Sequence, residues 1–383
     1  MYAFLSHQSA CEVLRTIGRV QSTWPPQKRK LPLAGDCVTN QRGFKQIARE
    51  TDLAEFGIVS TPVDLIVPKQ TMRSRGKSAH FHLWSTEIPA HAMLRVTPHL
   101  LISGPELVIA QLCGSQAKLE ELLDQHGRAA QAEIALVEGL GMDPRQAVID
   151  NALLRDSIER MVAATVVACE FAGTYRLGGA GRDTRYQVAP LMSTASLNAS
   201  IAQIEGTANK TRTAEVAMLM LEGSASPMET ALALFLTLPV NTGGMGLPRP
   251  ELNAAVDVSD VRGSLSDRDA VSPDVLWRSQ RVCLEYDSSA FHEKKGAAQL
   301  DRDARRANIL TACGYAVLRV TPGIIRTVAD VELLARQAAT LLGVELDTPS
   351  EVQKLRRRRL FALLMPQRRE DERGHVAEAL PNS

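Results

Sequence analysis

Aromatic residues are scarce in this sequence, because Phe, Trp and Tyr together make up only 4% of its 383 residues. A core must therefore be packed from Leu, Val, Ile and Ala, for which an apolar fraction of 45% is sufficient. A chain of this length predicts two or three domains. The net formal charge is only +1, so any surface that attracts a polyanion has to be a local concentration of basic residues.

The six cysteines are scattered and form no Cys-x-x-Cys pair, which argues against a structural zinc site and against a disulfide framework. Most lie in apolar runs and are expected to be buried thiols in a reducing compartment. The first residues show no charged segment followed by a long apolar one, and the longest apolar run, 161–169, is too short to span a membrane. We therefore expect a cytoplasmic protein without a membrane partner.

The first 115 residues predict a mixed α/β region. Ser9 and Glu12 have the spacing of a capping box before a short helix that ends near Gly18, and residues 41–51 predict a second helix. Two short helices joined by a loop are compatible with a winged-helix-like module. Strands are expected at 63–67, 79–84 and 100–103, a helix at 107–113, and a helical region at 116–222.

Two histidines alternate with apolar residues in the second of these strands. His80 and His82 are two residues apart, so they project from one face. The sequence shows no third ligand near them. Two half-exposed strand residues are therefore the favoured interpretation, ahead of a metal-binding pair.

The most informative stretch is 271–321, which predicts strand, turn, strand, loop, helix and strand. The strands are expected at 271–277, 282–287 and 315–321. Asp274 lies early in the first strand, and Glu285 and Asp287 share one face of the second. Carboxylates in a central strand are costly to bury without a cation, and clustered oxygens suit a hard ion such as Mg²⁺.

The helix expected after these strands carries an apolar stripe from Ala297 to Leu310. At about 100° per residue, Asp303 falls inside this stripe and Arg306 falls at its edge. Asp303 and Arg306 are three residues apart, within pairing reach. One acid and one arginine of the helix are therefore expected to face the sheet that carries Glu285 and Asp287.

These residues form a larger set of motifs: Pro273-Asp274, Leu284-Glu285-Tyr286-Asp287, His292, Asp303-x-x-Arg306-x-x-x-Leu310, Gly314-Tyr315 and Val317-Leu318-Arg319-Val320-Thr321. The set resembles small bacterial endonuclease-like domains related to very short patch repair endonucleases, in the PD-(D/E)xK superfamily. The resemblance covers roughly residues 224–343. It implies an α-β-β-β-α-β restriction-endonuclease-like core and hydrolysis of DNA phosphodiester bonds with Mg²⁺ or Mn²⁺.

The resemblance also implies roles for individual residues. Asp274 and Glu285 correspond to the metal-binding carboxylates, and Glu229 to a glutamate that often lies on the preceding helix. His292, Asp303 and Arg306 correspond to accessory residues. Ser226-Pro227-x-Glu229 is also a complete helix-start motif, so a purely structural role for Glu229 is an equal alternative.

One position departs from the superfamily pattern. The lysine that usually follows two residues after the second acid is Asp287 here. Lys294, Lys295 or His292 is then expected to supply the missing positive charge or proton transfer, and Asp287 to be a third ligand or a partner of His292. Salt bridges from Arg306 or Arg281 to the acids remain the alternative that needs no metal.

The N-terminal region and the C-terminal segment also suggest binding partners. Ser6-His7-x-Ser9-Ala10, the strand at 63–68 and Gly104-Pro105-Glu106 are loosely similar to abortive-infection antitoxin-like proteins, which implies a toxin or phage-defence partner. The segment 346–383 contains Lys354 and four consecutive arginines at 356–359. It predicts a basic amphipathic helix that contacts DNA phosphates, or a solvated or disordered tail.

The expected organisation is a multi-domain α/β (α+β) protein with regions 1–115, 116–222, 223–345 and 346–383. Two functions remain open: a metal-dependent DNA endonuclease in repair or defence, and a non-catalytic DNA-binding regulator on a degenerate nuclease fold. RNA is a further candidate target. Carboxylates of Asp274 and Glu285 within about 5 Å around open space favour the enzyme. Arg306 or Arg281 lying between these carboxylates favours the regulator.

Overall fold

The computed structural model describes residues 2–18, 25–32, 37–114, 156–178, 183–261, 269–287 and 297–365. The strands are β1 (Ala3–Leu5), β2 (Val63–Val67), β3 (Ser74–Arg75), β4 (Ala79–Leu83), β5 (Met93–Thr97), β6 (Leu100–Ser103), β7 (Tyr175–Arg176), β8 (Arg185–Tyr186), β9 (Glu251–Leu252), β10 (Val256–Asp257), β11 (Ala270–Val271), β12 (Val275–Trp277), β13 (Val282–Tyr286) and β14 (Ala316–Val320). The α-helices are α1 (His7–Ile17), α2 (Gln41–Glu50), α3 (Pro105–Gly114), α7 (Asp156–Ala172), α8 (Thr194–Gln203), α9 (Thr207–Leu219), α10 (Pro227–Thr237), α11 (Ala297–Ala312), α12 (Val328–Leu342) and α13 (Glu351–Leu364). The mixed α/β class expected from the sequence is confirmed.

The N-terminal region is built on one six-stranded mixed sheet with the order β3-β4-β2-β1-β6-β5. β1 lies in its middle, antiparallel to β2 and parallel to β6, and β2 is parallel to β4. The winged-helix-like arrangement considered for this region is therefore wrong. Its three-residue central strand, Ala3–Leu5, is almost entirely buried, but it is too short to be recognised from the sequence pattern.

The first helix also begins differently from the expected capping box. α1 starts at His7 after Ser6, and the Ser9 hydroxyl accepts a hydrogen bond from the backbone N–H of Asp64 at 3.0 Å. Glu12 accepts hydrogen bonds from Ser60 and from the backbone N–H of Val59. Ser9 thus ties α1 to β2, and Glu12 ties it to the loop before β2. These tertiary contacts replace the expected local cap.

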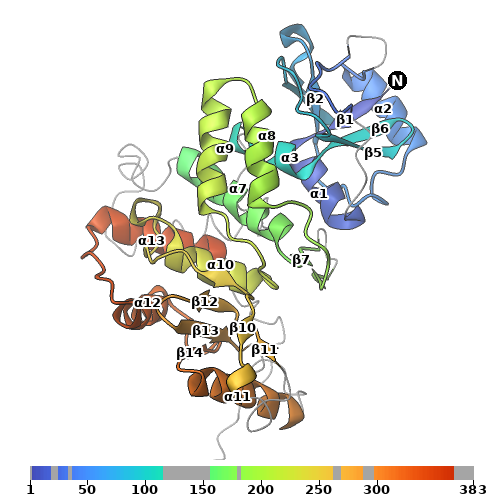
Figure 1. Cartoon of the computed structure of the whole chain (residues 1–383). Helices are drawn as coiled ribbons and strands as arrows, with labels where there is room; N and C mark the ends of the chain where they lie inside the picture. Colours follow the sequence, from blue (N-terminus) through green and yellow to red (C-terminus); the bar gives the residue numbers. More distant parts are fainter. Residues whose placement is uncertain are drawn as a thin grey trace, which may run out of the picture.

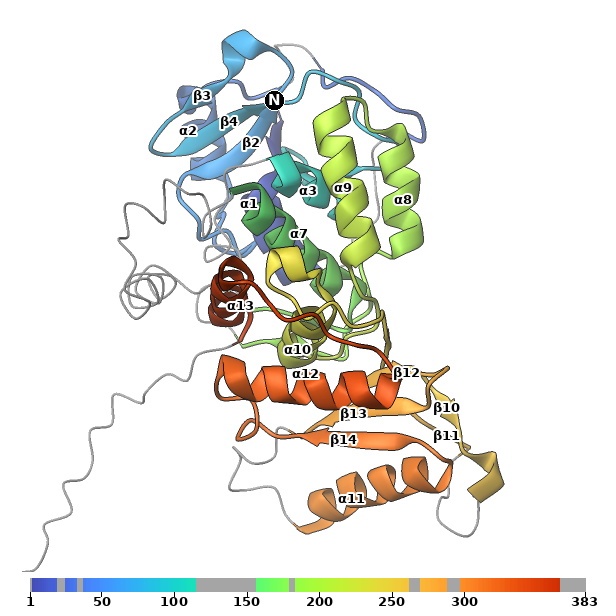
Figure 2. The same ribbon diagram turned by 90° about the vertical axis from the view of Figure 1, so that its left-hand side faces the viewer.

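Helix α7 lies between the N-terminal sheet and the C-terminal sheet, and α8 and α9 stand beside the N-terminal sheet (Figures 1 and 2). α7 packs against α3, α9 and α10. A buried ion pair joins Arg15 of α1 to Glu170 of α7, with Nη2 and Oε2 at 2.7 Å. One cluster of buried apolar side chains extends from β1 through these helices to the C-terminal sheet and α13.

The C-terminal region has a four-stranded sheet with the order β14-β13-β12-β9. β12 is antiparallel to β9 and β13, whereas β13 and β14 are parallel. α11 covers one face of this sheet and α12 the other (Figure 2). The strand expected at 271–277 is split into β11 and β12, and β11 pairs with β10 in a separate two-stranded sheet.

The helix α13 packs against α10 and α12 near the end of the described chain. Its basic residues form the expected exposed face only in part, because Lys354 and Arg358 are the ones that are exposed. Arg357 and Arg359 are buried, and Arg357 pairs with Glu332 of α12 at 2.7 Å. Arg356 donates a hydrogen bond to the carbonyl oxygen of Asn241. Residues 366–383 lie outside the described part.

Two further expectations concern the whole chain. Five cysteines are buried and Cys313 is half-buried, as the apolar surroundings of these residues predicted, and all six are free thiols. None of the helices in the described ranges has the length and apolar character needed to cross a lipid bilayer.

Candidate functional site

The two acids of the predicted nuclease site lie opposite each other on neighbouring strands. Val275 pairs with Leu284 in the antiparallel register, so Asp274, directly before β12, lies opposite Glu285 of β13. Both side chains are buried. The backbone N–H of Tyr286 donates a hydrogen bond to Asp274 Oδ2 at 2.6 Å, which fixes this carboxylate against β13.

The guanidinium group of Arg306 contacts both of these carboxylates. Its Nη2 atom lies 3.5 Å from Asp274 Oδ1 and donates a hydrogen bond to Glu285 Oε2. The arginine comes from α11, whose helical periodicity had placed it at the edge of the sheet-facing stripe. Its side chain is 34% exposed, so water reaches the pair from one side. The position where a shared metal ion was expected therefore already has a cation beside it.

Two further features describe the surroundings of the two carboxylates. Glu285 Oε1 is buried and makes no hydrogen bond to the described part of the chain. Cys283 lies on the same face of β13, and its burial raises the pKa of its thiol to about 12; nearby Arg306 opposes this rise and Asp274 adds to it. The thiol is therefore uncharged at neutral pH and adds no negative charge to the two carboxylates.

Asp287 has a different partner. Its carboxylate Oδ2 lies 3.5 Å from Nη2 of Arg319 on β14, and its backbone N–H donates to the carbonyl oxygen of Val320 at 2.8 Å. Asp287 therefore makes an ion pair with a neighbouring strand. His292, Lys294 and Lys295 lie outside the described residues, and so does the side chain of Asp303.

Glu229 is held at the start of α10. Its backbone N–H donates to the Ser226 hydroxyl at 3.2 Å, with Pro227 in the first turn. Its carboxylate Oε2 accepts hydrogen bonds from the backbone N–H of Ala225 at 2.9 Å and from Asn253 Nδ2 at 2.7 Å. These contacts correspond to the structural role that the helix-start motif predicted.

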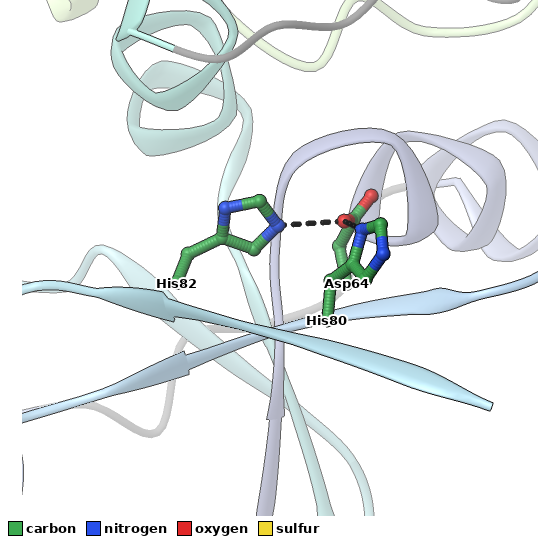
Figure 3. Close-up of side chains that lie close together, drawn as sticks. All are labelled: Asp64, His80 and His82. Atoms are coloured by element: carbon green, nitrogen blue, oxygen red, sulfur yellow. Dashed lines mark hydrogen bonds and ion pairs between the residues drawn. The ribbon is translucent and has the colours of Figure 1, made fainter. Parts of the chain in front are cut away.

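A second polar group lies on the N-terminal sheet, where the sequence indicated only a histidine pair. Asp64 of β2 pairs with His80 of β4 in a parallel register, and His82 projects from the same face of β4 (Figure 3). One potential ligand atom from each residue lies within 4.8 Å of the other two. These three residues can therefore hold a metal ion. The sequence signal that could have found Asp64 is an acid within the apolar run 63–67.

The N-terminus of α1 lies against this group. Ser6 donates its backbone N–H to the carbonyl oxygen of Asp64 at 3.0 Å, and the His7 ring is stacked on that of His82 with centroids 4.0 Å apart. Burial lowers the pKa of His7 well below its ordinary value, and neighbouring His82 adds to this. Partial burial also lowers the pKa of His80, although Asp64 opposes that shift. His7 and His80 are thus neutral at pH 7.

Comparisons with protein-family profiles, with curated proteins and with solved structures found no match to this chain. Its function has to be inferred from its own residues. The guanidinium of Arg306 contacts both acids, so an Mg²⁺ ion shared by the carboxylate pair would have to displace this side chain. The group on the N-terminal sheet contains no arginine or lysine.

Proposed function

We propose that the protein is a non-catalytic DNA-binding regulator in which a degenerate nuclease fold acts as the scaffold. The observation that carries this proposal is the contact of Arg306 with both Asp274 and Glu285. An arginine at this place neutralises part of the buried charge and stabilises the sheet against α11. The acids are then retained for folding and not for chemistry.

The order of elements supports the nuclease-like part of the proposal. α10, β9, β12, β13, α11 and β14 follow one another in the α-β-β-β-α-β order that the resemblance implies. The last two strands are parallel, with α11 as their connection. The short sheet β10–β11 is an insertion between β9 and β12.

Contacts with DNA phosphates need exposed cations, and the C-terminal region retains several. Arg281, Arg305 and Arg319 are exposed in or beside the four-stranded sheet and α11. Each phosphate that such a residue neutralises adds to the salt dependence of binding. The buried arginines of α13 do not contribute to this interaction.

Two measurements on the full chain test the proposal. Calorimetry with Mg²⁺ is expected to show no binding at sub-millimolar concentration, and a duplex DNA is expected to bind with an affinity that falls steeply with salt. Arg305→Ala should weaken that binding and lower the salt slope by about one. Arg336→Ala is the matched control, because Arg336 is exposed on α12 on the other face of the sheet. Mg²⁺ binding that disappears in Asp274→Ala would overturn the proposal.

The second candidate is a metal-dependent endonuclease acting in DNA repair or phage defence. The unpartnered Glu285 Oε1 favours it, as does the presence of two carboxylates against one guanidinium, which leaves a net negative charge. This candidate requires Arg306 to leave the carboxylates. It predicts cleavage of DNA or RNA that depends on Mg²⁺ or Mn²⁺ and is lost in Asp274→Ala and in Glu285→Gln.

A further inference from the structure

We propose that Asp64, His80 and His82 form a binding site for a divalent first-row transition-metal ion, zinc foremost, with a coordination position open to solvent. This site lies on the N-terminal sheet and does not depend on the function proposed for the C-terminal region. It is a different site from the carboxylate pair at which Mg²⁺ was expected.

The backbone pairing brings the three residues together. In the parallel register of β2 and β4, Asp64 pairs with His80, and Ile66 pairs with His82. Alternation along the strands puts Asp64, His80 and His82 on one face. They are therefore positioned by two hydrogen-bonded strands, which hold ligands more accurately than loops do.

The separations of the ligand atoms are close to those of a metal site. His82 Nε2 lies 2.7 Å and His80 Nδ1 lies 4.0 Å from Asp64 Oδ1. Bonds of about 2.0–2.1 Å in a tetrahedral site separate the ligand atoms by roughly 3.3 Å. Small side-chain rotations would bring both distances to that value without a change in the backbone.

The donor set determines the kind of ion. Two imidazoles and one carboxylate suit zinc, iron or another first-row ion, whereas Mg²⁺ and Ca²⁺ prefer oxygen alone. Sites with three protein ligands usually hold a water molecule in the fourth position. The side chains of His80 and His82 are 33% and 31% exposed, so solvent reaches the group and such a position is accessible.

Neighbouring residues hold the ligands in place. The backbone of Asp64 is bound on both sides, because its carbonyl accepts from the N–H of Ser6 and its N–H donates to the Ser9 hydroxyl. The ring of His82 is stacked on buried His7. A simple ion pair between His82 and Asp64 needs no second histidine, whereas a metal site accounts for His80 on the same face.

The charge of Arg75 should affect the affinity of the proposed site for a metal ion. It pairs with His80 across the antiparallel β3–β4 ladder and is exposed. Its positive charge opposes a cation bound beside His80, and solvent screens this effect. Removing it should strengthen metal binding by a factor of a few.

The test uses the full chain after treatment with a chelator. Co²⁺ is titrated while the visible absorption is followed, and the affinity for Zn²⁺ is then measured by competition with a chelating dye. We expect one Zn²⁺ per chain, and a loss of affinity of more than about a hundredfold in His80→Gln, His82→Gln and Asp64→Asn, since even residues that only support ligands cost 10–100-fold. His99→Gln is the matched control, because His99 is an exposed histidine outside the group.

Two further measurements test whether the ion binds at His80 and His82 and not at the carboxylate pair. In the wild type, NMR signals of the His80 and His82 rings should shift on addition of Zn²⁺ while that of His99 stays in place, a readout that needs no variant to fold. Asp274→Ala should bind Zn²⁺ as the wild type does. Absence of Zn²⁺ binding to the wild type, or binding that survives in His82→Gln or is lost in Asp274→Ala, would overturn the proposal.

Discussion

The two larger sheets of this protein both hold acidic side chains beside basic ones, but the basic partners differ. On the C-terminal sheet, Asp274 and Glu285 are buried and contact Arg306, a permanent cation supplied by a helix. On the N-terminal sheet, Asp64 lies beside two partly exposed histidines. A guanidinium competes with other cations for a carboxylate, whereas imidazoles are themselves metal ligands. In our proposals, the partner of the acid therefore determines which sheet binds a metal ion.

Among the variants considered, removal of the Arg306 side chain should have the largest effect on stability. Arg306→Ala leaves two buried carboxylates facing each other, and we expect the free energy of unfolding to fall by about 2–3 kcal/mol. This is less than the roughly 3–5 kcal/mol of a fully buried pair, because the arginine side chain is 34% exposed. Denaturation in urea near neutral pH measures the loss.

Mg²⁺ should restore part of the stability of Arg306→Ala and leave the wild type unchanged, since a ligand stabilises only the state that binds it. The control is Arg336→Ala, which removes an exposed arginine on α12 and should cost less than about 0.5 kcal/mol. Equal losses in the two variants would show that Arg306 does not neutralise the acids.

Zinc should stabilise the protein through the group on the N-terminal sheet. At a free concentration tenfold above the dissociation constant, Zn²⁺ should stabilise the wild type by about 1.4 kcal/mol. The shift should vanish in His82→Gln and persist in Arg306→Ala, because the ion binds the N-terminal sheet. Thermal unfolding with and without Zn²⁺ checks this expectation. A shift retained by His82→Gln would place the ion elsewhere.

Glu229→Gln separates a structural from a metal-binding role for this residue. Glutamine can still accept the hydrogen bonds from Ala225 and Asn253, but the negative charge at the first turn of α10 is lost. We expect a loss of at most about 1 kcal/mol in the free energy of unfolding. Neither Mg²⁺ nor Zn²⁺ binding should change. Glu345→Gln, at an exposed acid, is the control, and a changed metal affinity in Glu229→Gln would contradict the structural role.

The smallest effect concerns Cys283 beside the carboxylate pair. Burial raises the pKa of its thiol from 9.0 to about 12, so the folded state keeps a proton that the unfolded state loses between these values. The associated stability is complete below pH 9 and is lost as the pH rises from 9 to 12. We expect a loss of under about half a kcal/mol by pH 9, detectable as a shallower alkaline slope in Cys283→Ala than in Cys313→Ala. Equal slopes would show that Cys283 is not protected by the fold.

Local patterns were sufficient for much of the C-terminal region. The strands β13 and β14, the helix α11 and the helix start at Ser226 all follow from alternation, apolar periodicity and capping residues. The same periodicity placed Arg306 toward the sheet, where it contacts Glu285. These features depend on neighbours within a few residues along the chain, so the sequence records them directly.

The sequence-based predictions failed where a strand or side chain contacts residues that are distant along the chain. β1 has three residues, and only its pairing with β2 and β6 makes it the centre of a sheet. The group on the N-terminal sheet was seen as two histidines without a third ligand, because Asp64 reaches them through a parallel pairing of β2 and β4. Parallel pairing brings together strands that are joined by a long connection, and no local pattern reports it.

From local patterns the sequence predicted many of the strands and helices, together with the face on which His80 and His82, or Glu285 and Asp287, lie. Only the tertiary structure decided how these faces meet: Arg306 beside Asp274 and Glu285, and Asp64 beside His80 and His82. The physical reason is that charge interactions act over a few ångströms in space. The residues they join here are separated by 16 or more positions along the chain.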